Sequence, residues 1–234
     1  DVPRHAGRWT RPGGDVDAVA RQSIALLCSL PGTLGLYQGE ELGQVDTDIL
    51  FSELRDLGYI AFWPENKGRD GCRTPMAWEH DQPNAGFSTG TPWLPVKEPQ
   101  RARSVDLQEA RAGSVLHAYR ETLALRRSTR ALREGATSFL DLPEPLLGVV
   151  RALPGEAVTA VFNLAERPLE LDLGGEASAL APMAAALDGR ALVLPAYGFA
   201  FLSSPSPPAV MHVGDPPAAP APAPPASLAN PDPR

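Results

Sequence analysis

The stretch from residue 15 to residue 43, DVDAVARQSIALLCSLPGTLGLYQGEELG, places a long apolar segment, a helix stop and a short apolar run in direct succession. Asp15 is a favourable helix N-cap and Pro31–Gly32 ends the segment, so the sequence predicts a helix over residues 15–30. Its apolar residues cover more than one face, which is typical of a helix buried between a sheet and its neighbours. The run Thr33–Tyr37 is too short for a helix, and we predict a buried strand of a parallel sheet there.

Two acidic residues follow this predicted strand directly. Glu40 and Glu41 stand between Gly39 and Gly43, which let the backbone approach a ligand closely. Polar residues just after a parallel strand mark the mouth of an α/β fold, where ligands bind. We therefore expect Glu40 to face a ligand and Glu41 to make structural ion pairs. Cys28, inside the preceding helix, is expected to be a small core residue.

Residues 44–103 show no sustained period, apart from a possible short helix at Asp48–Leu57. A connection of this length inside a compact domain is usually a lid or a binding loop. It contains Lys67–Trp78, KGRDGCRTPMAW, in which closely spaced arginines on a glycine-bent backbone suit paired contacts to a carboxylate. The plainer alternative is a solvated basic loop. The loop also carries aromatic residues that either stack on sugar rings or pack the loop against the domain: Trp63, Trp78, Phe87 and Trp93.

The spacing of apolar residues changes after the long loop. A helical turn at residues 105–111 and an amphipathic helix at 114–127 precede several short, alternating runs separated by turn residues. The predicted strands are 136–141, 146–151, 157–163, 169–173, 191–194 and 197–202. Strands at this spacing indicate an antiparallel sandwich, with a domain boundary near residues 128–135. Residues 205–234 are rich in Pro and Ala and predict a disordered tail.

Composition and charge exclude several function classes. A net charge of −7 without a dense basic face argues against nucleic-acid binding, and no apolar run is long enough to span a membrane. Two cysteines make no disulfide framework, so a reduced, cytoplasmic setting is the default. The four histidines are too dispersed for a metal cluster or a Ser-His-Asp triad, and no phosphate-binding glycine motif occurs, so we expect no metal and no cofactor. The remaining candidate residues are carboxylates, arginines and aromatics, which are the residue types that carbohydrate-binding sites use.

Four motifs together resemble one enzyme group. They are GEELG after the strand at 33–37, GRDGCRTPMAW, PNAGFSTGTPWLPV and SVLHAYRETLALR. They are similar to the α-glucosidase and oligo-1,6-glucosidase branch of the α-amylase superfamily. The resemblance runs from Asp1 to about residue 127, and more loosely to Leu202. It implies that residues 1–130 form the C-terminal portion of a TIM barrel whose last strand is 33–37. Residues 131–204 would then form a β-sandwich, and residues 205–234 the disordered tail.

The resemblance also implies roles for particular residues. Asp1 matches the third catalytic carboxylate of the family, which stabilises the oxocarbenium-like transition state. Arg4 matches an arginine that holds the carboxylate cluster, and Arg73 matches one that contacts the glucosyl unit and pairs with an upstream Asp. Glu40 is expected to bind substrate, and Arg69 and Asp70 to shape the loop. The nucleophilic Asp and the general-acid Glu would precede Asp1, which together with the missing initiator Met predicts a processed or truncated piece.

The implied parent protein hydrolyses terminal α-linked glucose from short oligosaccharides with retention, and the chain by itself is expected to be inactive. The expected partner is a small oligosaccharide or α-glucoside, with no nucleic acid or membrane and an unknown oligomeric state. A glucosyltransferase, a sucrose hydrolase and a trehalose-forming relative stay open. A non-catalytic amylase-like subunit is a further alternative, although such proteins tend to lose the residues matched by Asp1, Arg4 and Arg73. A third is a β domain and tail acting as an interaction or carbohydrate-binding module.

Overall fold

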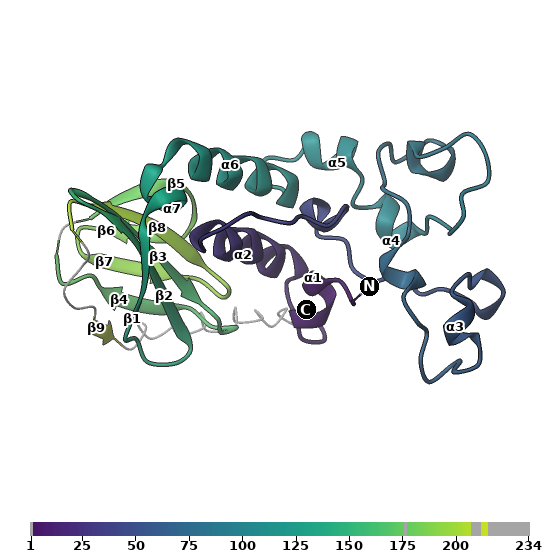
Figure 1. Cartoon of the computed structure of the whole chain (residues 1–234), viewed down its shortest axis with the longest axis horizontal. Coiled ribbons are helices and arrows are strands. Elements are labelled where there is room, and N and C mark those ends of the chain that lie inside the picture. The colour runs from purple at the N-terminus through teal and green to yellow at the C-terminus, as the bar shows by residue number, and fades with distance from the viewer. Residues whose placement is uncertain (1, 176, 207–211, 215–234) are drawn as a thin grey trace, which may run out of the picture.

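The computed structural model describes residues 2–175, 177–206 and 212–214. The elements follow a helical first half and a stranded second half (Figure 1). The helices are α1 (His5–Trp9), α2 (Val16–Ser29), α3 (Leu57–Ile60), α4 (Glu98–Arg101), α5 (Val105–Glu109), α6 (Val115–Ser128) and α7 (Arg130–Glu134). Single 3-10 turns are η1 (Glu40–Leu42), η2 (Phe51–Glu53), η3 (Asp70–Cys72) and η4 (Pro83–Gly86). The strands are β1 (Ala136–Leu140), β2 (Leu146–Leu153), β3 (Glu156–Asn163), β4 (Leu169–Asp172), β5 (Ser178–Ala184), β6 (Ala186–Asp188), β7 (Ala191–Leu194), β8 (Phe199–Ser204) and β9 (His212–Gly214).

The two predicted long helices are confirmed, and both begin at a side-chain cap. The Asp15 carboxylate accepts a hydrogen bond from the Ala18 backbone N–H at 3.0 Å, which starts α2. The Ser114 hydroxyl accepts one from the His117 N–H at 3.3 Å, which starts α6. The helices lie side by side in the middle of the molecule (Figure 1), and a buried cluster that includes Cys28 joins them. Cys28 is fully buried, as predicted for a core residue.

The second half forms the predicted antiparallel sandwich. One sheet has the order β1-β2-β3-β8-β5 and the other has the order β6-β7-β4-β9, and every pairing is antiparallel. The six predicted strands are present with ends shifted by a few residues, whereas β5 and β6 were not predicted. Strand β9 falls inside the segment predicted as a disordered tail and pairs with β4, so that prediction is wrong for residues 212–214. The rest of the predicted tail beyond residue 206 lies outside the described residues.

The five-stranded sheet is covered on both faces. On one face, Phe162 of β3 and Phe201 of β8 pack with Ala25 of α2 and Leu132 of α7. On the other face, Val161 packs in a leucine-rich cluster against the second sheet. Because both faces are buried, β3 is apolar along most of its length rather than alternating. The helical half and the sandwich therefore share one hydrophobic core across α7, which lies within the boundary region predicted at 128–135.

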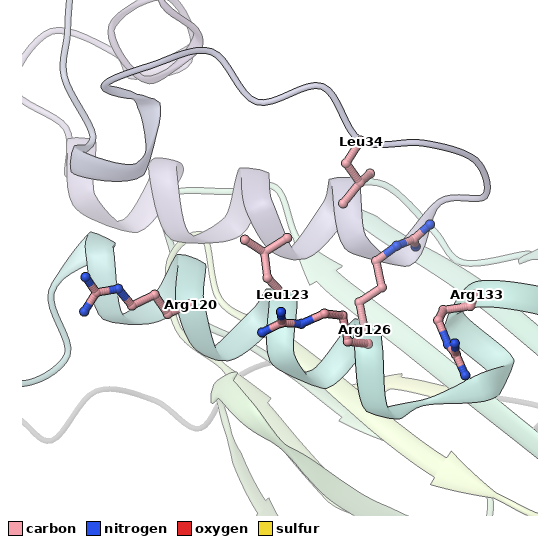
Figure 2. A pocket seen from close by; sticks show the side chains of 6 residues that line it. Leu34, Arg120, Leu123, Arg126 and Arg133 are labelled. Carbon is pink, nitrogen blue, oxygen red and sulfur yellow. The ribbon is translucent and has the colours of Figure 1, made fainter. Parts of the chain in front are cut away.

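Arginines from outside α2 donate hydrogen bonds to the carbonyl oxygens at its C-terminal end. The last carbonyls of a helix have no partner within it. Arg126 of α6 donates to the carbonyl oxygens of Cys28 and Leu30 at 2.7 and 2.8 Å, and Arg151 of β2 donates to that of Ser29 at 3.2 Å. Figure 2 shows Arg126 among the side chains that line a cavity of about 400 Å³ between α6 and the segment that carries Leu34. These contacts bind the helix end to its neighbours.

The buried strand predicted at residues 33–37 is not formed among the described residues. The segment forms no strand, and Leu36 and Tyr37 are each 42% exposed. A strand requires a hydrogen-bonding neighbour, and none of the described residues pairs with this segment. The helix expected at Asp48–Leu57 is likewise reduced to the single turn η2, while the turn expected at 105–111 is confirmed as α5.

Candidate functional site

Arg4 is held tightly where α1 begins. Its backbone N–H donates to Asp46 Oδ1 at 2.8 Å, and its Nη1 donates to the Gln38 carbonyl oxygen, also at 2.8 Å. The guanidinium carbon lies 5.1 Å from the centre of the Tyr37 ring. Gly39 passes beside it with φ of +88°, and a Cβ at that position would come within 3.0 Å of Arg4 Nη1. The same Cβ would lie 2.4 Å from Gln44 Oε1, so the left-handed backbone and both neighbouring side chains favour glycine at position 39.

Half of this guanidinium is unused. Arg4 is 5% exposed, yet its Nε and Nη2 are buried and have no hydrogen-bond partner among the described residues. Burial lowers the pKa of Arg4, but an arginine side chain is not deprotonated in proteins, so the group is charged. A buried guanidinium with free donors is costly unless an acceptor is supplied. The geometry leaves two donors for a carboxylate. Asp1, the predicted catalytic residue, lies outside the described residues.

Glu40 points into the packing between helices. Its Oε1 accepts a long hydrogen bond from the Tyr119 hydroxyl of α6 at 3.5 Å, and its Oε2 lies 4.0 Å from His5 Nδ1 of α1. Burial raises the pKa of Glu40 and lowers that of His5. The carboxylate therefore contacts α1 and α6, and these contacts suit a group that holds α1, and with it Arg4, in place.

The arginine loop is organised around Asp56. Arg69 donates to Asp56 through Nε at 2.7 Å and Nη2 at 3.1 Å, a paired contact of the kind the sequence predicted. Arg73 Nη1 lies 3.8 Å from the same carboxylate, and Arg69 holds the pKa of Asp56 below its usual range. Asp56 therefore lies at the long end of ion-pair distance from Arg73. The expectation that Arg73 pairs with a carboxylate from upstream of residue 1 stays a prediction.

A buried carboxylate fixes the backbone on which Asp56 stands. Asp70 is fully buried, and its Oδ2 accepts the backbone N–H groups of Arg55 at 2.6 Å and Asp56 at 2.8 Å. Arg69 and Asp70 thus shape the loop, as the sequence indicated. Cys72 is buried and its thiol donates to the Arg69 carbonyl at 3.1 Å, which is a structural contact.

Gln38 links the two arginine regions. Its carbonyl accepts from Arg4, and its side-chain amide donates to the carbonyl of Thr74, the residue after Arg73, at 3.1 Å. Gln38 thereby ties Arg4 to the loop segment that carries Arg73, at the end of segment 33–37. Glu40 lies two residues further along and contacts His5 of α1 instead. Sequence reasoning missed Gln38 and Asp56, since neither stands in a recognisable motif. A glutamine following the apolar run was the available signal for Gln38.

The described residues of the site are suited to binding. It presents buried and half-buried guanidinium groups, which suit carboxylates and sugar hydroxyls. No group of three or more His, Cys, Asp or Glu side chains in the described ranges is placed to hold a metal ion. Across those same ranges, no helix combines the length and the apolar composition that crossing a membrane requires.

Comparison with known proteins gives the family. The chain is 43% identical to a probable alpha-glucosidase of Rhizobium meliloti (strain 1021) over 173 residues, which cover 74% of this chain and 31% of that protein. It is 31% identical to an oligo-1,6-glucosidase of Heyndrickxia coagulans over 191 residues, which cover 74% and 34%. The crystal structure of the alpha-glucosyl transfer enzyme XgtA superposes with a TM-score of 0.79 at 43% identity, covering 87% of this chain and 38% of that one.

This chain therefore spans about a third of the length of the curated relatives it matches. The model of the alpha amylase catalytic domain matches residues 1–135, which are the residues that carry Arg4, Glu40 and the arginine loop. The chain belongs to the α-amylase family of glycoside hydrolases.

Proposed function

We propose that this chain is the C-terminal part of a retaining α-glucosidase that hydrolyses terminal α-linked glucose from short oligosaccharides. The names of the similar proteins, an α-glucosidase and an oligo-1,6-glucosidase, support this substrate class. The chain carries the glucosyl-binding side of the site. The nucleophilic Asp and the general-acid Glu belong to the part of the protein that precedes residue 1.

Within this proposal, residues 1–130 complete a TIM barrel whose last strand is 33–37. The segment has the surroundings of a strand that lacks its neighbours. One cavity of about 400 Å³ reaches Leu34, and a second of about 300 Å³ lies beside Leu36 and Tyr37, both against α6. Neighbouring strands would cover this segment and supply its hydrogen bonds.

The observation that carries the proposal is the half-paired guanidinium of Arg4. Its free Nε and Nη2 suit a paired contact to a carboxylate. Glycoside hydrolysis by retention needs two carboxyl groups about 5–5.5 Å apart, and such clusters are stabilised by a neighbouring cation. We assign Arg4 to that cluster, Asp1 to stabilisation of the oxocarbenium-like transition state, and Arg73 to the bound glucosyl unit.

The test uses the whole protein. Replacing Arg73 with alanine should lower kcat/KM for maltose by at least 100-fold, or about 2.7 kcal/mol of transition-state stabilisation. Arg190→Ala is the matched control, because Arg190 also pairs with a carboxylate, Asp172 at 2.7 Å, but lies in the sandwich. Near-normal turnover of the Arg73 variant would refute its assigned role. Release of glucose from maltose by the 234-residue chain alone would refute the proposal that the nucleophilic Asp and the general-acid Glu lie outside this chain.

Glucosyl transfer is the second candidate. It is favoured by the 43% identity to a protein named as an alpha-glucosyl transfer enzyme. The two reactions share the glycosyl-enzyme intermediate and differ in whether water or a second hydroxyl compound attacks it. Product analysis of the whole protein with maltose and an added alcohol acceptor separates them. A hydrolase releases two glucose molecules from each maltose, whereas a transferase releases one glucose as the leaving group and joins the other to the acceptor as a new glucoside.

A further inference from the structure

Gln44 is a buried glutamine that follows the turn η1. Its backbone N–H donates to the Gly39 carbonyl oxygen at 3.1 Å, and Gly39 and Gly43 take the left-handed backbone conformations that close the turn. Gln44 is 1% exposed, and its Oε1 and Nε2 are both buried without a hydrogen-bond partner among the described residues. A buried amide in this state costs free energy that an apolar side chain of the same length would not, so its presence calls for an explanation.

The guanidinium of Arg4 lies next to this amide. Arg4 Nη1 and Gln44 Oε1 both lie within 3.0 Å of the point that a Cβ on Gly39 would occupy. Nη1 carries two N–H donors, and the Gln38 carbonyl oxygen accepts from Nη1 at 2.8 Å. One N–H of Nη1 is thereby used, which leaves the other for the amide oxygen of Gln44.

The two unpaired nitrogens of Arg4 lie on one edge of its guanidinium. Nε and Nη2 are buried and have no partner among the described residues. In a planar guanidinium these two nitrogens form a fork that binds both oxygens of a carboxylate. Arg69 uses the same fork for Asp56, through Nε at 2.7 Å and Nη2 at 3.1 Å. Fixing Nη1 therefore determines where the Nε–Nη2 fork of Arg4 points.

The acidic side chains near Arg4 do not occupy this fork. The titratable groups that interact electrostatically with Arg4 are Tyr37, Glu41, Asp46, Cys72, His5 and Glu40. Asp46 accepts the backbone N–H of Arg4 rather than a guanidinium N–H, and Glu40 contacts Tyr119 and His5. Within the described residues, the fork is therefore open to a further carboxylate.

We propose that Gln44 is a positioning residue for the reaction. Together with the Gln38 carbonyl oxygen, it holds Nη1 of Arg4 so that the Nε–Nη2 fork faces the catalytic carboxylates. This inference rests on the proposed function, in which Arg4 belongs to the carboxylate cluster. A cation beside the nucleophilic carboxylate lowers the pKa of that group and keeps it ionised. When the guanidinium is no longer held, its charge acts less on the cluster, so the pKa of the nucleophile rises.

The experiment measures the pH dependence of maltose hydrolysis by the whole protein. Gln44→Met keeps the length of the side chain and removes both of its hydrogen-bonding groups. It should lower kcat about fivefold and change KM by less than about twofold. The acid limb of kcat/KM, which reports ionisation of the nucleophile in the free enzyme, should move upward by about half a pH unit. Gln44→Glu has the same shape and places beside Nη1 a carboxylate that competes for the charge of Arg4, so its acid limb should move in the same direction.

Gln22→Met is the matched control. Gln22 is 8% exposed on α2, and its amide donates to the carbonyl oxygens of Asn163 and Gly198 at 2.7 and 3.3 Å. Replacing it should lower the melting temperature, because those hydrogen bonds are lost, and leave kcat and the acid limb unchanged. A purely structural role for Gln44 would give the same pattern in Gln44→Met.

The outcomes separate the two proposals. An acid limb in Gln44→Met that coincides with that of the unaltered protein would overturn the inference about Gln44 and leave the proposed function standing. If Gln44→Met does not fold, as judged by circular dichroism, an unshifted acid limb in Gln44→Glu would overturn it in the same way. An unaltered whole protein that does not cleave maltose would overturn the proposed function, and the inference with it.

Discussion

Replacing Arg126 with methionine should loosen the end of α2 while leaving its packing intact. Methionine keeps most of the aliphatic stem, so the change removes the guanidinium. Arg126 donates to the carbonyl oxygens of Cys28, Leu30 and Leu132 at 2.7–3.1 Å, in addition to Gly32 at 2.8 Å. Two of the part-buried bonds, to Cys28 and Leu30, hold the end of α2. Taking about 1 kcal/mol net for each, the end of the helix loses about 2 kcal/mol of protection against local opening. That corresponds to a factor of about 30 in the opening equilibrium.

Hydrogen exchange followed by mass spectrometry measures this directly. Amides in peptides that cover residues 22–32 should exchange about 30-fold faster in Arg126→Met, while peptides from β2 and β3 change little. Arg127→Met is the matched control, because Arg127 is the next residue, lines the same cavity and is exposed. Equal protection of the α2 end in the two variants would refute the argument that Arg126 satisfies these carbonyls.

Three further predictions follow from burial. Burial raises the pKa of Glu40, so the folded protein retains a proton that the unfolded chain has released, and stability from this group falls as pH rises through the raised pKa. Glu40→Gln keeps an acceptor for Tyr119 and should flatten this fall in thermal stability as the pH rises above 4.5, the ordinary pKa of the group; an unchanged profile would contradict it. Burial raises the pKa of the Cys28 thiol to about 11, so the native protein should resist iodoacetamide at pH 8 until urea is added, and rapid native labelling would count against it. Leu36→Asp should lower the free energy of unfolding of the whole protein by about 3 kcal/mol if neighbouring strands cover residue 36. Leu107 is 41% exposed on α5, so Leu107→Asp should lower it much less. Equal losses of stability in the two variants would argue against the barrel assignment.

Helices α2 and α6 were predictable because their signals are local. Asp15 and Ser114 provide caps, and the apolar spacing that follows gives the period. Most of the sandwich strands were predictable for the same reason. Strands β5 and β6 were not, because they are rich in alanine, lack β-branched residues and have exposed or half-exposed positions throughout. Strand β9 was hidden by the proline-rich composition around it and exists through its pairing with β4.

The segment at 33–37 shows the limit of a local signal. Its composition predicts a strand, but strand formation depends on neighbours that the composition does not specify. In the described residues the segment is left exposed and unpaired. The site had the same limit. Closely spaced arginines predicted a paired contact to a carboxylate, but the spacing did not identify Asp56 as the partner of Arg69. That pairing depends on the loop conformation, which Asp70 fixes by accepting the Asp56 backbone N–H.

The contacts of the arginines divide the site into two parts. The loop carrying Arg73 is fixed inside the chain, because Asp56 pairs with Arg69 and the backbone at Asp56 is held by buried Asp70. Arg4 is different, since its Nε and Nη2 are buried without an acceptor among the described residues. An unsatisfied buried cation costs free energy that an incoming carboxylate would recover. The loop should therefore keep its geometry independently of the rest of the enzyme, whereas Arg4 reaches its lowest energy only when a carboxylate cluster is placed against it.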